Sequence, residues 1–144
     1  MTSVDNGAGL ARRFRPEDRD QVIALWSRVF PDDPPHNAPG LMLLKKLAVD
    51  EMVFVAEQEN VIAGACMAGY DGHRGWLYAV AVLPEFRGSG VGRQLVQCAS
   101  AALKEIGCIK VNIQIRAGNT EVLEFYQRLG FHEEDRISMG LFLE

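Results

Sequence analysis

The segment PEFRGSGVG, residues 84–92, combines one arginine with three glycines at alternate positions. Glycine costs backbone entropy, and it is favoured where the chain turns left-handed or where another backbone or a ligand approaches closely. An apolar run, residues 76–83, precedes this segment, and helical spacing follows it. Backbone N–H groups at a helix start, together with the helix dipole, favour a bound anion. The segment therefore predicts a phosphate-binding loop, with a plain tight turn as the alternative.

Neither of the two familiar nucleotide-binding loops fits this spacing. A P-loop needs Lys followed by Ser or Thr after its last glycine, whereas Arg93 and Gln94 follow Gly92. The dinucleotide-binding pattern would need a glycine at position 93. The loop is thus expected to bind phosphate in a different way.

Cysteine and histidine offer no pattern typical of a metal site. Cys66, Cys98 and Cys108 lack CxxC spacing and lie in apolar segments, where free cysteine commonly behaves as a small buried hydrophobe. The three histidines stand singly along the chain. We expect three free thiols and no metal.

Strand and helix patterns alternate around the glycine segment. Runs rich in β-branched and aromatic residues between turn residues indicate strands, and apolar residues three and four apart indicate helices. The order predicts an α/β sheet with a strand–helix–strand crossover after the glycines. The expected strands are residues 10–14, 52–57, 61–70, 76–83, 109–115 and 137–144, and the expected helices are residues 15–30, 41–50, 91–106 and 119–130.

Turn and capping residues mark the boundaries of these elements. Four of the six prolines lie in residues 31–40, which we expect to form a surface loop between the first two helices. Gly107 is expected to follow the end of the third helix. Asn119 or Thr120 is expected to cap the fourth helix.

Length and charge restrict the class of protein. A chain of 144 residues with 48% hydrophobic and 24% charged residues is expected to fold around one core. Its 15 basic and 19 acidic residues give a net charge of −4, the wrong sign for neutralising a nucleic acid. Residues 1–9 lack the regions of a signal peptide, and the longest apolar run is too short to span a membrane. We expect a cytoplasmic protein without nucleic-acid or membrane partners, with a flexible tail at 1–9 and one domain at 10–144.

Two motifs resemble those of the GNAT superfamily of N-acetyltransferases. The segment VAVLPEFRGSGVGRQLV resembles its acetyl-CoA signature, with Arg87, Gly90 and Gly92 at the three defining positions. The segment NTEVLEFYQRLGF, residues 119–131, is similar to the Asn, aromatic-Tyr, Leu-Gly-Phe pattern that follows the fifth strand in this superfamily. The segment GYDGHRG, residues 69–75, resembles the small bacterial YpeA-type branch, which is related to the ribosomal-protein alanine acetyltransferases.

The resemblance implies a GNAT fold, with a mixed but mostly antiparallel sheet, about four helices, and a splay between the fourth and fifth strands. Acetyl-CoA would be the cosubstrate, and its pantetheine would lie beside the fourth strand. That strand would bulge near Val80 and Val82, so that a backbone N–H there faces the thioester oxygen. Both valines are also explained as core residues. The pyrophosphate would be bound by the segment formed of Arg87, Gly88, Ser89, Gly90, Val91, Gly92 and Arg93.

The resemblance also implies a proton donor. Tyr126 occupies the tyrosine position of the superfamily and would protonate the departing thiolate, although packing of the Phe125–Tyr126 pair on the sheet is an alternative. Asn119 would cap its helix and could also contact the cofactor.

The general base is not evident. Gln114 and Trp76 stand at the two positions where relatives carry a glutamate. Asp71 and His73 in the DGHRG turn are substitute candidates, but an Asp beside Gly commonly just shapes a hairpin. Proton loss through bound water is a further possibility.

These features predict direct acetyl transfer from acetyl-CoA to a primary amine, on a small metabolite or a protein N-terminus, without a covalent enzyme intermediate. Gln114 in place of glutamate argues against the protein N-terminus. The protein would be a monomer or a homodimer. The alternative is a non-enzymatic acyl-CoA-binding or regulatory module, which the missing carboxylates favour and Tyr126 opposes.

Overall fold

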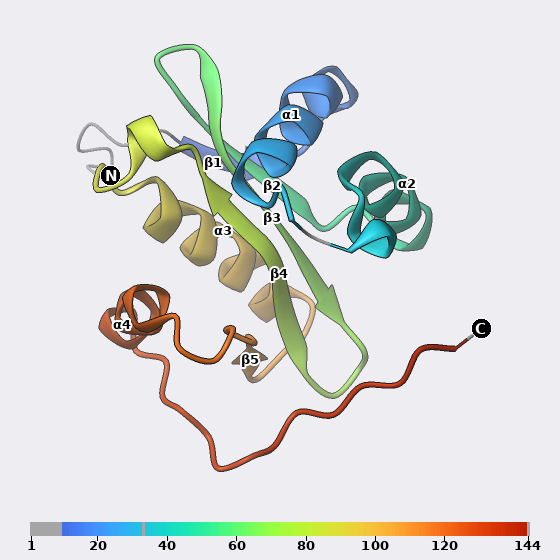
Figure 1. The fold of residues 1–144 in the computed structure, drawn as a ribbon, viewed down its shortest axis with the longest axis vertical. Helices are drawn as coiled ribbons and strands as arrows, with labels where there is room; N and C mark the ends of the chain where they lie inside the picture. Colours follow the sequence, from blue (N-terminus) through green and yellow to red (C-terminus); the bar gives the residue numbers. More distant parts are fainter. Residues whose placement is uncertain (1–9, 33, 144) are drawn as a thin grey trace. The chain divides into compact units, whose positions relative to one another are not determined.

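The computed structural model describes residues 10–32 and 34–143 (Figure 1). The tail expected at residues 1–9 lies outside the described residues. The chain divides into two compact units, Met1–Ile113 and Gln114–Glu144.

The first unit contains a five-stranded sheet whose strands follow one another in chain order. All neighbouring pairs are antiparallel except β4 and β5, which run parallel and pair only at Gly75↔Val111 and Trp76↔Asn112. The mixed sheet and the splay between its fourth and fifth strands confirm the GNAT fold expected from the sequence. The strands are β1 (Leu10–Arg13), β2 (Val53–Gln58), β3 (Val61–Tyr70), β4 (Gly75–Val82) and β5 (Val111–Asn112).

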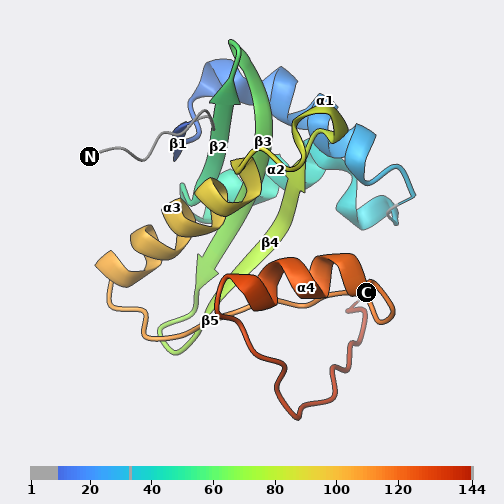
Figure 2. The same cartoon turned by 90° about the vertical axis from the view of Figure 1, so that its left-hand side faces the viewer.

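Helices cover both faces of this sheet, with α1 (Arg19–Val29) and α2 (Pro39–Val49) on one face and α3 (Val91–Glu105) on the other (Figure 2). The face under α1 and α2 holds a core that includes Trp26 and Leu43. On the opposite face, a Cβ at Gly64 would lie 2.8 Å from both Val91 and Leu95 of α3. Glycine at this position therefore lets α3 pack directly onto the sheet. Short 3₁₀ turns, η1 (Pro16–Asp18), η2 (Pro35–Asn37) and η3 (Pro84–Phe86), precede the three helices.

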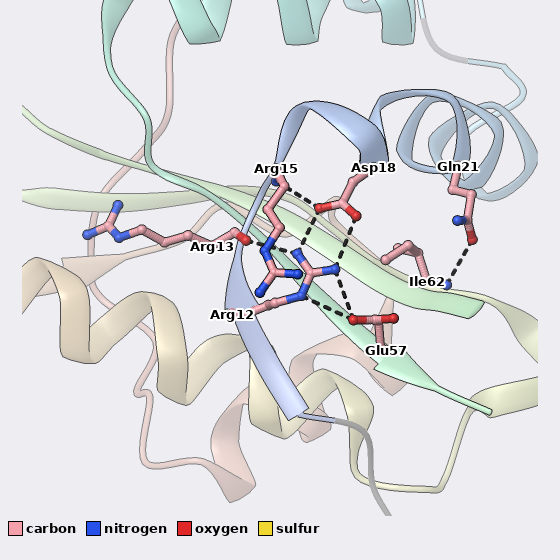
Figure 3. A network of polar contacts seen from close by, with 7 residues as sticks. All are labelled: Arg12, Arg13, Arg15, Asp18, Gln21, Glu57 and Ile62. Carbon is pink, nitrogen blue, oxygen red and sulfur yellow. Dashed lines mark hydrogen bonds and ion pairs between the residues drawn. The ribbon is translucent and has the colours of Figure 1, made fainter. Parts of the chain in front are cut away.

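A polar network ties the start of α1 to the edge of the sheet (Figure 3). The Arg12 guanidinium on β1 donates to both carboxylate oxygens of Asp18, at 2.8 and 3.1 Å, and also to Glu57 on β2 at 2.9 Å. Burial alone would raise the pKa of Asp18, but hydrogen bonds from Arg12 and from the Arg15 backbone, with the Arg12 charge, hold that pKa below its ordinary value. These paired charges thus help to fix the start of α1 on the sheet.

The second unit contains one helix, α4 (Thr120–Arg128), in its described residues. The Asn119 side chain accepts a hydrogen bond from the Val122 N–H at 3.3 Å, so the expected asparagine cap is confirmed. The rings of Phe125 and Phe131 meet Tyr126 edge-on, with centroids 4.9 and 5.3 Å away. Packing within this aromatic group accompanies the burial of Tyr126, which is 6% exposed.

Two expected strands differ from the structure. The strand expected at 109–115 is reduced to Val111–Asn112, because β5 pairs with β4 only where the two strands begin. The strand expected at 137–144 is wrong for its described residues, since 137–143 have no strand structure. An alternating pattern does not form a strand unless a partner strand completes the hydrogen-bond ladder.

The other expected elements are present, with boundaries shifted by a few residues. The strand at 61–70 has its expected limits, and Gly107, with φ of 98°, follows the end of α3 as expected. No helix among the described residues is long and apolar enough to cross a membrane.

Candidate functional site

Strand β4 carries a bulge in its second half. Ala65 pairs with Ala81 and Met67 pairs with Tyr78, so Cys66 alone on β3 faces both Ala79 and Val80 on β4. Ala79 has a φ of 51°, an uncommon value for a residue other than glycine. A bulge leaves its extra residue without a ladder partner and turns the strand. The structure thus has the bulge near Val80 that the resemblance implies.

Trp26 of α1 contacts this bulge directly. Its indole N–H donates to the Ala79 carbonyl at 2.8 Å, and the Trp26 side chain is fully buried. In the sequence, Trp26 lies within the helix expected at residues 15–30. The contact could not be predicted, because 53 residues separate donor and acceptor and no local signal links them.

The glycine segment forms the turn between β4 and α3. Gly88 and Gly90 have φ values of 83° and 91°, which only glycine adopts readily. Gly90 is the N-cap residue of α3, and no side chain caps this helix. The first backbone N–H groups of a helix have no partner within it. An uncapped start preceded by two left-handed glycines therefore fits a phosphate group well.

Hydrogen bonds hold this turn against the sheet. The Arg87 Nε–H donates to the Val82 carbonyl at 3.3 Å, which folds the arginine back over the end of β4. The Ser89 hydroxyl lies within hydrogen-bond distance of the Phe86 carbonyl and of the Gln58 side chain on β2. Val91 is buried at the start of α3, whereas Gly92 is partly buried and Arg93 is exposed. The turn is thus held by hydrogen bonds to β2 and β4 on one side and by the buried start of α3 on the other.

The structure favours a turn-shaping role for Asp71. One of its carboxylate oxygens accepts from the backbone N–H groups of His73 and Arg74, both at 2.8 Å. Hydrogen bonds from the backbones of Arg74 and His73 lower the pKa of Asp71. A carboxylate with a lowered pKa is a weaker base. Asp71 and His73 are both exposed in the turn before β4.

Two predicted site residues, Asn119 and Tyr126, belong to the second unit. Asn119 caps α4 and Tyr126 lies in the aromatic group described above. Gln114, where some relatives were expected to carry glutamate, donates through its side-chain amide to the Ser138 hydroxyl at 2.7 Å. The residues from Val80 to Arg93, in contrast, lie together in the first unit at the junction of β4 and α3.

Cys66, Cys98 and Cys108 are free thiols, as the sequence predicts. Cys66 and Cys108 are buried as small hydrophobes, whereas Cys98 is only half-buried. Burial raises the pKa of both Cys66 and Cys98 above the usual thiol value. These two thiols therefore remain protonated and poorly nucleophilic at neutral pH.

Comparison with known proteins supplies independent findings. A family model described as the acetyltransferase (GNAT) family matches residues 19–131. The solved structure of aminoglycoside N-acetyltransferase AAC(6')-Iy in complex with CoA is similar at a TM-score of 0.78 and 22% identity, covering 97% of this chain and 99% of that chain. The structure of glucosamine-6-phosphate N-acetyltransferase from Arabidopsis thaliana is similar at a TM-score of 0.67 and 21% identity. The match covers 93% of this chain and 97% of that chain. The structure of a transcriptional regulator from Bacillus halodurans C-125 is similar at a TM-score of 0.73 and 21% identity. The match covers 94% of this chain and 99% of that chain.

Proposed function

Because the chain belongs to the acetyltransferase (GNAT) family, a family of acetyl-CoA-dependent N-acetyltransferases, we propose that it transfers acetyl from acetyl-CoA directly to a primary amine. The two units would act as one catalytic domain over residues 10–144, in a cytoplasmic monomer or homodimer. Because residues 69–75 resemble the small bacterial YpeA-type branch, we propose that the chain belongs to this subgroup of the family. Two similar structures are acetyltransferases of amine-bearing sugars, by their descriptions, which supports a small amine as acceptor.

One observation carries this proposal: the uncapped start of α3 follows two left-handed glycines and a bulged strand. Coenzyme A has a pyrophosphate for the helix start and a peptide-like pantetheine for the strand. The amides from Arg87 to Arg93 would bind the phosphates, with Arg87 adding a positive charge. The backbone of Val80 and Val82 would hold the pantetheine and place the thioester.

The proposed reaction is an attack by the neutral amine on the thioester carbonyl. The developing oxyanion would accept a hydrogen bond from the backbone N–H of Val80 or Val82, an interaction worth about 3 kcal/mol per donor in such sites. Collapse of the tetrahedral intermediate breaks the carbon–sulfur bond and releases a thiolate. No covalent bond to the enzyme forms.

Tyr126 is the proposed general acid for the departing thiolate. A thiol has an ordinary pKa of about 8.5, so a positioned donor favours its release near neutral pH. A buried tyrosine presents its hydroxyl as the single polar group on an apolar ring. Asn119, as the cap of the same helix, would help to position it and could contact the cofactor.

The acceptor amine must lose a proton during the reaction. Trp76 and Gln114 supply no carboxylate for this, and Asp71 is engaged by its own turn. We therefore favour proton loss to bound water, with His73 as the remaining candidate base. An acceptor amine of lower pKa than lysine needs less help from a base.

The alternative function is non-enzymatic binding of acyl-CoA. The missing carboxylates, and the similarity to a chain described as a transcriptional regulator, favour a module that binds acyl-CoA without turning it over. Such a module would keep the phosphate-binding turn and would not need Tyr126.

An amine panel with acetyl-CoA distinguishes the two functions. Free thiol release is followed for aminoglycosides, amino sugars, polyamines and peptide N-termini, and mass spectrometry identifies the acetylated product. We expect amine-dependent thiol release in equal amount to the product, above a control without amine. Tight binding of acetyl-CoA with no product from any amine would instead support the regulatory module.

A further inference from the structure

The Trp26 indole contacts a backbone segment on which the proposed chemistry depends. It donates to the carbonyl of Ala79, the residue directly before Val80. That carbonyl lies within the two-residue bulge opposite Cys66. The peptide unit that contains this carbonyl also contains the Val80 N–H, because carbonyl and N–H are parts of one planar group. Holding the Ala79 carbonyl therefore fixes the direction of the Val80 N–H.

The bulge has a backbone geometry that needs external support. Alanine at a φ of 51° is in the left-handed region, which residues other than glycine rarely adopt. Such conformations persist where surrounding contacts determine them, and they cluster at functional sites. The 2.8 Å hydrogen bond from a fully buried indole is such a contact.

The donor itself is held in place at both ends of its helix. At the start of α1, Arg12 binds Asp18, and the Gln21 side chain accepts from the Ile62 N–H at 3.1 Å (Figure 3). At the last turn, Arg28 pairs with Glu85 at 2.8 Å, in the 3₁₀ turn that leads to the glycines. Helix α1 thus connects the edge of the sheet, the bulge and the phosphate-binding turn.

We propose that Trp26 is a positioning residue for acetyl transfer, since its indole N–H holds the Ala79–Val80 peptide so that the Val80 N–H faces the thioester oxygen. The inference rests on the proposed function of the β4 bulge. Trp26 acts through the backbone and does not itself contact the acetyl group. An apolar side chain of the same shape would fill the core equally well and lose this role.

Replacement of Trp26 by benzothienylalanine tests the role, because sulfur replaces the N–H while the ring shape is kept. The matched control is the same replacement at Trp76, the other tryptophan of the chain. We expect the Trp26 replacement to lower kcat by about 10-fold to 10²-fold, the size of effect that small misplacements produce. The affinity for coenzyme A should fall by a smaller factor than kcat, because the proposed phosphate-binding turn keeps its contacts.

A second readout separates this proposal from the proposed function. Amide NMR reports the Val80 N–H without turnover, and we expect its acetyl-CoA-dependent shift to be lost in the Trp26 replacement and kept in the Trp76 control. If the native protein transfers no acetyl group, the proposed function fails, and this shift still tests the position of the peptide. A Trp26 replacement that keeps both kcat and the Val80 shift, with or without a lower melting temperature, would overturn the proposal.

Discussion

The segment from β4 to α3 and the segment 137–143 are both rich in apolar residues, but they use them in opposite ways. In the first, Leu77, Ala81 and Leu95 are at most 4% exposed. In the second, the five large apolar side chains are all at least 77% exposed: Ile137, Met139, Leu141, Phe142 and Leu143. The proposed phosphate-binding turn therefore stands on a packed scaffold, as rigid ligand sites require. The C-terminal segment takes no strand structure despite a strand-like pattern.

The same substitution in the two regions gives the largest contrast in stability. Leu95→Ala removes a fully buried side chain, and we expect it to lower the free energy of unfolding by about 2–5 kcal/mol. Leu141→Ala, at 84% exposure, should change it by less than about 0.5 kcal/mol. Urea denaturation measures both. A large loss for Leu141→Ala at low protein concentration would break the comparison, because it would mean that this segment is packed in solution.

A negative charge at the start of α3 should weaken cofactor binding strongly. Gly90→Asp places a side chain and a charge where phosphate oxygens would approach the amides, at a residue with a left-handed φ. We expect the affinity for coenzyme A to fall by at least about 10²-fold in calorimetry. Gly107→Asp, a matched change at the opposite end of the helix with a φ of 98°, should bind coenzyme A normally. Equal affinities in the two folded variants would remove the phosphate role of the turn.

Removal of the Tyr126 hydroxyl should separate chemistry from binding. Tyr126→Phe keeps the ring that meets Phe125 and Phe131 and removes the proposed proton donor. We expect kcat and kcat/KM to fall together by about 10²-fold, with unchanged affinity for coenzyme A. Tyr70→Phe serves as control, since that hydroxyl donates weakly to the Gly107 carbonyl at 3.4 Å. A Tyr126→Phe variant at the parental rate would assign the ring to packing and the proton to water.

Arg87 should have the smallest effect of this series, because its side chain is exposed and already donates to Val82. Arg87→Ala is expected to weaken coenzyme A by about tenfold. The loss should be smaller for pantetheine fragments that lack the phosphates. Arg19→Ala, another exposed arginine, is the control. Equal losses for coenzyme A and the fragments would make Arg87 a structural residue.

Local patterns explain which parts could be predicted from the sequence. The strand at Val61–Tyr70 and the helix at Thr120–Arg128 follow from periodicity and capping, because neighbouring residues determine them. The turn at Gly88 and Gly90 follows from glycine alone. In each case the signal lies within a few residues of the feature it predicts.

Other features depend on residues far apart in the chain. The bulge at Ala79 interrupts an apolar run of ordinary strand composition, and Trp26, its hydrogen-bond partner, lies on the first helix. The short β5 and the missing strand at 137–143 depend on where a neighbouring strand is available. Strand pairing is a non-local property, so an alternating pattern such as that of residues 137–143 does not decide it.

The most direct test of the central claim is an amide NMR titration of the whole chain with acetyl-CoA. We predict that the largest shifts fall on the N–H groups of Val80 and of residues 88–93, at the β4 bulge and the start of α3. Gly107, at the opposite end of α3, should shift little. Saturable binding that leaves Val80 and residues 88–93 unshifted while other amides move would contradict this account.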